Sequence, residues 1–138
     1  MTLNKTKMAE VLFPMLSEFH SISDRELQAV WQVYTEGSVD HIVLNFGSIA
    51  LAVTADEDDD SIDFRVADPT DFRNPDDFDV SHLEPWKRFI GKSFGWGWVT
   101  VNQQGYCDGL LLSFEGVTPQ VVLNVMASSI GAGLITRV

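Results

Sequence analysis

The chain has 138 residues, of which 45% are hydrophobic and fifteen aromatic, so it is long enough to form one domain with its own core. Its net charge of −11 argues against nucleic acid and anionic membranes as partners, because both carry negative charge. A lone cysteine, Cys107, excludes an intrachain disulfide. No apolar stretch reaches membrane-spanning length, and a cytoplasmic location is expected.

The first expected element is an amphipathic helix over about residues 7–19. Its apolar residues recur at helical spacing: Met8, Val11, Leu12, Met15 and Phe19. Pro14 has no N–H to donate and crowds the preceding turn, so we expect the helix either to kink or to begin later, with Pro14 in its first turn.

The next segment can be interpreted in two ways. Ser23 and Glu26 have the spacing of a capping box, which favours a second helix. The β-branched and aromatic residues at 30–35 instead favour a strand, and we predict a strand over about 28–35.

The middle of the chain alternates strands and turns, followed by a long surface loop. Strands are predicted over 41–46, 49–55 and 62–66. Residues 67–81 are rich in Pro and Asp, which predicts the loop. A short helix near 82–90 is predicted next, because Ser81 can cap it and Gly91 can end it.

The last third predicts a Trp-rich hairpin over 94–114 around a turn at 102–105. Strands are predicted at 121–125, where a helix capped by Thr118 is the alternative, and at 134–136 after a flexible 131–133 segment. The pattern predicts a single α+β domain over residues 1–138. Its mostly antiparallel sheet has six to eight strands, with one N-terminal and one short helix.

The acidity is regional. Residues 56–79 hold eleven Asp or Glu residues and two Arg, a local charge of −9, which leaves −2 for the rest of the chain. Such a surface favours a basic protein partner. The predicted partner-binding residues are Asp56, Glu57, Asp58, Asp59, Asp60, Asp63, Asp76, Asp77 and Asp79.

A calcium loop starting at Asp56 fails twice, because Ser61 stands where glycine is needed and Ala67 where a bidentate Glu should close the cage. A solvated strand connection is the preferred interpretation over a metal site. In the second acidic loop, Phe72 and Phe78 either anchor a partner or, as preferred, pin the loop to its own core.

The hairpin supplies a second candidate, a polar and aromatic ligand face. Its residues are Trp96, Trp98, Asn102, Tyr106 and Asp108. Two exposed indoles can stack on a ring-shaped ligand, but core packing or a subunit contact is preferred for the tryptophans. For the polar residues, a hydrogen-bonded hairpin end is the preferred alternative.

Catalytic and metal-binding templates are not matched. Cys107 has no neighbouring base, so an inert thiol is expected. The three histidines (His20, His41 and His82) lack metal-ligand spacing. No catalytic residue, metal or cofactor is therefore predicted.

Two segments carry a resemblance to known sequences. They are DDDSI at 58–62 and GWGWVTVNQQGYCDGLLLSF at 95–114, with the motif residues Trp98, Asn102, Gln104, Gly105, Tyr106 and Asp108. These resemble a family of small acidic bacterial, often cyanobacterial, proteins of unknown function. That family is similar in size and acidity to immunity proteins of toxin systems, which implies a binding role.

The leading hypothesis is therefore a non-enzymatic, immunity-like protein that binds a basic protein through its acidic surface. The alternatives are a metal-dependent enzyme built on the same carboxylates, and a structural subunit that forms a homodimer or larger homo-oligomer.

Overall fold

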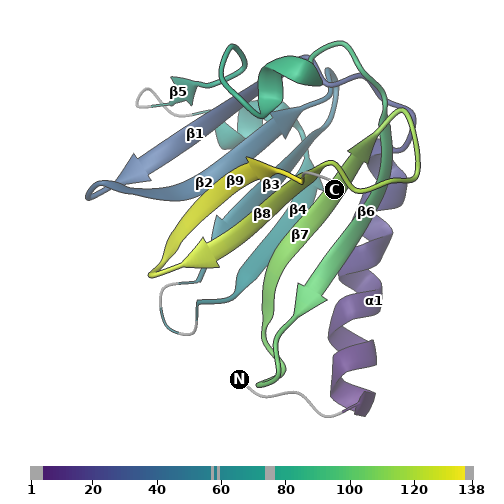
Figure 1. Cartoon of the computed structure of the whole chain (residues 1–138), viewed down its shortest axis with the longest axis vertical. Helices are drawn as coiled ribbons and strands as arrows, with labels where there is room; N and C mark the ends of the chain where they lie inside the picture. Colours follow the sequence, from purple (N-terminus) through teal and green to yellow (C-terminus); the bar gives the residue numbers. More distant parts are fainter. Residues whose placement is uncertain (1–4, 57, 59, 74–76, 136–138) are drawn as a thin grey trace.

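The computed structural model describes residues 5–56, 58, 60–73 and 77–135. Within them the chain forms one domain with an N-terminal helix and two antiparallel sheets (Figure 1). The predicted α+β class is confirmed, although nine strands in two sheets replace the predicted single sheet of six to eight strands.

The first sheet has the strand order β4-β3-β2-β1-β5. Its strands are β1 (Ala29–Thr35), β2 (Ser38–Asn45), β3 (Ala50–Ala55), β4 (Ile62–Ala67) and the two-residue β5 (Phe78–Asp79). The four longer strands confirm the prediction, including the strand preferred over a capped helix at 28–35. There, packing of Val30 and Trp31 in the sheet outweighs the local helix-start signal.

The second sheet has the order β6-β7-β8-β9. Its strands are β6 (Phe94–Val101), β7 (Cys107–Phe114), β8 (Val121–Met126) and β9 (Ser129–Leu134). The Trp-rich hairpin and the strand at 121–125 are confirmed. The last strand was predicted too late, because Gly131 and Gly133 lie inside β9 and pair with β8 instead of forming a flexible connection.

The helix predicted over about residues 7–19 is confirmed as α1 (Lys5–Ile22). It runs through Pro14, which excludes the alternative of a start at Pro14; the burial of Phe19 and Ile22 holds the turns that follow the proline. Another prediction needs correction. The predicted helix near 82–90 is only a 3₁₀ turn, η2 (Trp86–Arg88). Pro85 has no N–H and disfavours helical backbone in the residue before it, which prevents a longer helix.

The two sheets face each other, and α1 lies beside the edges formed by β4 and β6 (Figure 1). Phe19 is the contact that joins these parts. Its ring stacks on Phe64 of β4 at 4.8 Å between ring centroids and on Phe94 of β6 at 5.9 Å. Glu18 adds a hydrogen bond, because its carboxylate accepts the Val66 N–H at 2.9 Å. The helix therefore closes one side of the two-sheet core.

The core between the sheets is aliphatic and aromatic. Its buried members include Ile42, Leu44, Leu51, Val53, Leu110, Leu112, Phe114, Leu123 and Ile130. Trp86 from η2 and Phe89 beside it also enter this core, so their burial follows the predicted face even though the helix does not form. Fully burying one such side chain contributes about 1.5–3 kcal/mol.

Gly97 of β6 leaves the space that Phe19 occupies, since a Cβ atom at Gly97 would lie 2.5 Å from the Phe19 ring. We expect Gly97→Ala to lower the free energy of unfolding by about 1–3 kcal/mol, because the ring or the strand must move. Urea unfolding followed by far-UV circular dichroism measures this. Gly116→Ala is the control, because a Cβ there meets no atom within 4 Å; an equal loss in both variants would contradict the steric explanation.

Candidate functional site

Four β-turns lie along one end of the two sheets, from the β1–β2 turn at the left of Figure 1 to the β6–β7 turn at its bottom. We call this region the hairpin end and define it by the segments 35–41, 55–63, 101–108 and 125–129. They connect β1 to β2, β3 to β4, β6 to β7, and β8 to β9. Because consecutive antiparallel strands are joined at this end, segments far apart in sequence lie together.

Side-chain hydrogen bonds join three of these turns. The Asp60 carboxylate, in the β3–β4 turn, accepts the Ser128 N–H at 2.8 Å from the β8–β9 turn. The Ser129 hydroxyl accepts the Val39 N–H of β2 at 3.1 Å. These contacts span 68 and 90 residues of sequence, and they hold the turns of both sheets in one surface.

A polar hollow of about 300 Å³ lies between the β3–β4 and β6–β7 turns. It is lined by Asp60, Asn102, Gln103, Gln104, Tyr106, Asp108 and Val125. The fold thus brings one predicted partner-binding residue, Asp60, together with three residues of the predicted ligand face. Two carboxylates, three carboxamides and a phenol are groups that can accept hydrogen bonds from a cationic side chain.

Part of this polar set maintains the hairpin itself. The Asn102 carboxamide oxygen accepts the N–H groups of Gln104 and Tyr106 at 2.9 and 3.2 Å, which is the predicted role of a turn-forming Asn. One oxygen of Asp108 accepts the Thr100 hydroxyl at 2.8 Å. The hollow therefore has walls that are fixed by local hydrogen bonds before any ligand binds.

The hairpin end has many acidic residues and neither Lys nor Arg. Its four segments contain nine Asp or Glu residues and no Lys or Arg in the sequence. Among those described, Asp56, Asp58, Asp60 and Asp63 are solvent-exposed. Glu36 and Asp40 extend the surface, because with Ser128 they line a neighbouring hollow of about 200 Å³. Glu57 and Asp59, also predicted, lie outside the described residues.

The second acidic loop lies elsewhere. It follows the opposite end of β4, roughly 20 Å from the β3–β4 turn at about 3.3 Å per strand residue, and it covers the outer face of the first sheet. Phe72 packs there against the buried cluster of Trp31, Val43, Ala50 and Ala52, which confirms that this aromatic pins the loop. Asp77 lies 3.9 Å from Arg73, whose guanidinium rests on the Trp31 ring.

The remaining predicted residues of that loop differ in their surroundings. Hydrogen bonds from the Ser81 hydroxyl and backbone N–H lower the pKa of Asp79, so this carboxylate serves the turn. Phe78 is exposed and meets only the edge of Tyr34 among the ring contacts described, so it does not pin the loop. Asp76 lies outside the described residues. The two acidic segments therefore do not form one continuous site.

The tryptophan pair is separate from the polar hollow. Trp96 is 57% exposed, Trp98 is half-buried, and neither belongs to the buried core. Their ring centroids lie 6.2 Å apart on the outer face of the second sheet. The preferred interpretation as core residues is therefore wrong for both. The face that they form is uncovered by the described residues, and the subunit-contact alternative stays a prediction.

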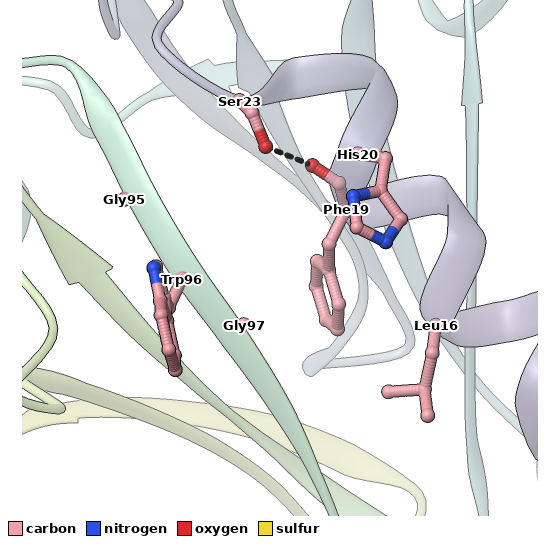
Figure 2. Close-up of a pocket in the computed structure, with 7 residues that line it drawn as sticks. All are labelled: Leu16, Phe19, His20, Ser23, Gly95, Trp96 and Gly97. Carbon is pink, nitrogen blue, oxygen red and sulfur yellow. Dashed lines mark hydrogen bonds between the residues drawn. The ribbon is translucent and has the colours of Figure 1, made fainter.

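A groove of about 390 Å³ separates α1 from β6 (Figure 2). Leu16, Phe19, His20 and Ser23 line it from the helix side, and Gly95, Trp96 and Gly97 from the strand. The Ser23 hydroxyl donates to the Phe19 carbonyl at 3.1 Å, and His20 is the only titratable side chain in this lining. These residues do not form a nucleophile and base pair.

Within the part of the chain that the structure describes, no three His, Cys, Asp or Glu side chains gather as a metal site would require. The described residues also include no helix that is long and apolar enough to cross a bilayer. His20 lies on α1, His41 on β2, and His82 in the turn between β5 and η2.

Sequence reasoning did not find Glu36, Asp40 or Ser128 as members of the hairpin end. Their membership depends on which turns meet in space, and no local pattern records that. The one available signal was charge: every turn-forming segment at this end lacks Lys and Arg.

A helix packed beside two facing antiparallel sheets, with an acidic polar end, defines this chain as a small α+β domain with an open surface site. The chain belongs to the Family of unknown function (DUF6334), which matches residues 8–138. This confirms the resemblance at the level of a family without known function. Comparison with curated proteins and with solved structures gave no match.

Cys107 lies in the 101–108 segment of the hairpin end, so the reactivity of its thiol reports the burial and the negative charge there. Burial raises the pKa of Cys107 to about 11, assisted by the negative charges of Asp108 and Asp63. At pH 8 the thiolate fraction is then roughly 100-fold below that of a free cysteine. We expect Ellman's reagent to react at least about tenfold more slowly with the native chain than with the chain in guanidinium. Equal rates would contradict a protected thiol.

Proposed function

We propose that this protein is a non-enzymatic binding protein whose hairpin end receives a basic protein. The observation that carries the proposal is the gathering of four turns that contain nine carboxylates and no Lys or Arg. Such a surface steers a positively charged partner by long-range attraction and repels anionic macromolecules. The partner class is therefore protein, with neither nucleic acid nor membrane as the target.

The polar hollow supports a specific mode of contact. A Lys or Arg side chain of the partner enters between Asp60 and Asp108, and the Gln103 and Gln104 carboxamide oxygens accept its remaining hydrogen bonds. Both carboxylates already accept hydrogen bonds within the chain, Asp60 from Ser128 and Asp108 from Thr100, which fixes their positions. A preorganised acceptor set loses less conformational entropy on binding than a mobile one.

The resemblance stated above is consistent with this role, since immunity proteins are small acidic proteins that bind toxins. We extend the proposal to a bacterial, cytoplasmic protein with an immunity-like task. The Asp79 and Asp77 loop contributes to the overall negative field at a distance, outside the contact itself.

The test compares two variants with equal charge change. Asp58→Asn, Asp60→Asn and Asp108→Asn together remove three charges at the hairpin end and retain an acceptor oxygen at each position. The control is Glu10→Gln, Asp24→Asn and Glu26→Gln, three exposed carboxylates outside the hairpin end. We expect the first variant to associate roughly tenfold more slowly with a partner captured from lysate, and the control to change little.

The measurement is surface plasmon resonance at about 50 mM and about 500 mM NaCl, since salt screens steering over the Debye length. Binding by the wild-type chain should weaken steeply at the higher salt, and the hairpin-end variant should show a flatter dependence. Equal association rates for both folded variants would contradict the proposal.

The alternative, a metal-dependent enzyme that uses the same carboxylates, makes a different prediction. A bound cation would raise the melting temperature, because a ligand that binds only the native state stabilises it. Under our proposal, millimolar calcium, magnesium or manganese leaves the melting temperature unchanged in differential scanning fluorimetry. A rise that Asp58→Asn abolishes would favour the metal hypothesis.

A further inference from the structure

The outer faces of the two sheets differ. On the first sheet, Phe72 and the loop around it cover Trp31 and Val43. On the second sheet, the described residues leave the outer face of β6, β7, β8 and β9 open, and this sheet lies in front of the first in Figure 1. An open sheet face with an exposed Trp96 is a place where another surface can pack.

Two rows of residues cross this open face, as the strand register shows. The first row runs Trp98, Leu111, Val122, Gly133, and the second runs Thr100, Gly109, Asn124, Gly131. Neither row contains an ionisable side chain, although the chain carries a net charge of −11; the Asp108 carboxylate, which accepts the Thr100 hydroxyl, borders the second row. A second strongly acidic molecule therefore meets less local repulsion over these rows than at the hairpin end.

The side chains in each row have complementary sizes. The first row decreases in size, from Trp98 through Leu111 and Val122 to Gly133. The second row alternates, with a side chain at Thr100 and Asn124 and none at Gly109 and Gly131. Each row is therefore complementary in side-chain size to the same row read in the opposite order, as a second copy would present it.

Gly133 has no role within the chain that requires glycine. A Cβ atom there would lie 3.9 Å from the nearest atom, Val122 Cγ1, which is ordinary contact, and no positive φ is recorded. At Gly97, by contrast, the Phe19 ring excludes a side chain. Glycine weakens a strand, and inside one it often marks the close approach of another molecule.

We propose that a second copy of this chain packs on the outer face of the second sheet. A two-fold axis parallel to the strands, between β7 and β8, places β6 of one copy over β9 of the other. Trp98 then lies over Gly133 of the other copy and Leu111 over Val122. Each pair occurs twice, as an isologous interface requires.

The area of this face sets the strength of the contact. Four strands spaced by about 4.8 Å, over six to eight residues of about 3.3 Å each, present roughly 500 Å² per copy. The total of about 1,000 Å² is at the lower limit for a specific interface, so the dimer dissociates on dilution. Because the axis follows the strands, both hairpin ends point the same way, and their mutual repulsion weakens the dimer at low salt.

Sedimentation velocity at about 500 mM NaCl, from about 1 to 300 μM, tests this interface. We expect the mass to rise from 15.4 kDa toward twice that value. Trp98→Gly and Gly133→Trp should each raise the dissociation constant at least about tenfold, and the double variant should recover most of the affinity because the large and small partners are exchanged. Phe13→Ala, an exposed aromatic on α1, is the control.

A monomer at every concentration would overturn the proposal, as would a dimer that Gly133→Trp leaves intact. Wild-type chain alone provides a second measurement, in case a variant does not fold. Its tryptophan emission should shift to longer wavelength on dilution, because Trp96 and Trp98 become hydrated while Trp31 and Trp86 stay buried. No shift would contradict the interface.

This inference stands apart from the proposed function, because salt acts on the two in opposite directions. Salt strengthens contact between two acidic copies and weakens binding of a basic partner. Gly133→Trp should therefore leave partner capture unchanged, and the hairpin-end Asn variant should leave the dimer intact.

Discussion

The structure depends on the contact between Phe19 of α1 and Gly97 of β6. Because Gly97 has no side chain, the Phe19 ring reaches between the two sheets and stacks on Phe64 and Phe94. Without this wedge the edges of β4 and β6 would expose the core to water. The helix thereby closes one side of the core and leaves the hairpin end open.

The backbone of the hairpin end adopts conformations that residues other than glycine disfavour. Glu36, Asp60, Ala127 and Ser128 all adopt positive φ, which is costly for residues other than glycine. Asp60 and Ser128 stabilise each other by a hydrogen bond across 68 residues of sequence. The same turns also bring like charges together. Positive φ at Glu36, Ala127 and Ser128 is the geometry that two-residue hairpin turns require, so it follows from the β1–β2 and β8–β9 connections. The clustering of like charges is the feature on which the proposed binding role rests.

Local patterns determined most of the elements but not how they meet. The β-branched and aromatic residues at 30–35 predicted β1 correctly, because the sheet rewards the preference that these residues already have. The helix near 82–90 failed, since Ser81 and Gly91 are helix signals that Pro85 overrides. The glycines of β9 led to the wrong prediction of a flexible segment at 131–133, because glycine normally signals a loop.

The candidate site was predictable only in part. Asp60 and Asp108 were each identified from the sequence, but their presence in one hollow follows from the pairing of distant turns. The exposure of Trp96 could not be predicted from the sequence either. Period-two spacing places Trp96 and Trp98 on one face of β6, but only the position of Phe19 on the opposite face decides which of the two faces is the core.

The two outer sheet faces show two ways to manage exposed aromatic surface in an acidic chain. On the first sheet, Arg65 lies over the Phe72 ring and Arg73 over the Trp31 ring. Two of the few cationic side chains of the chain therefore cover its own aromatic rings. The second sheet has no such cover among the described residues, and its uncharged rows instead match their own reverse. If a second copy covers them, the two acidic hairpin ends face one direction. The two rows lie outside the polar hollow, so self-association and partner binding use different residues and respond to salt in opposite directions.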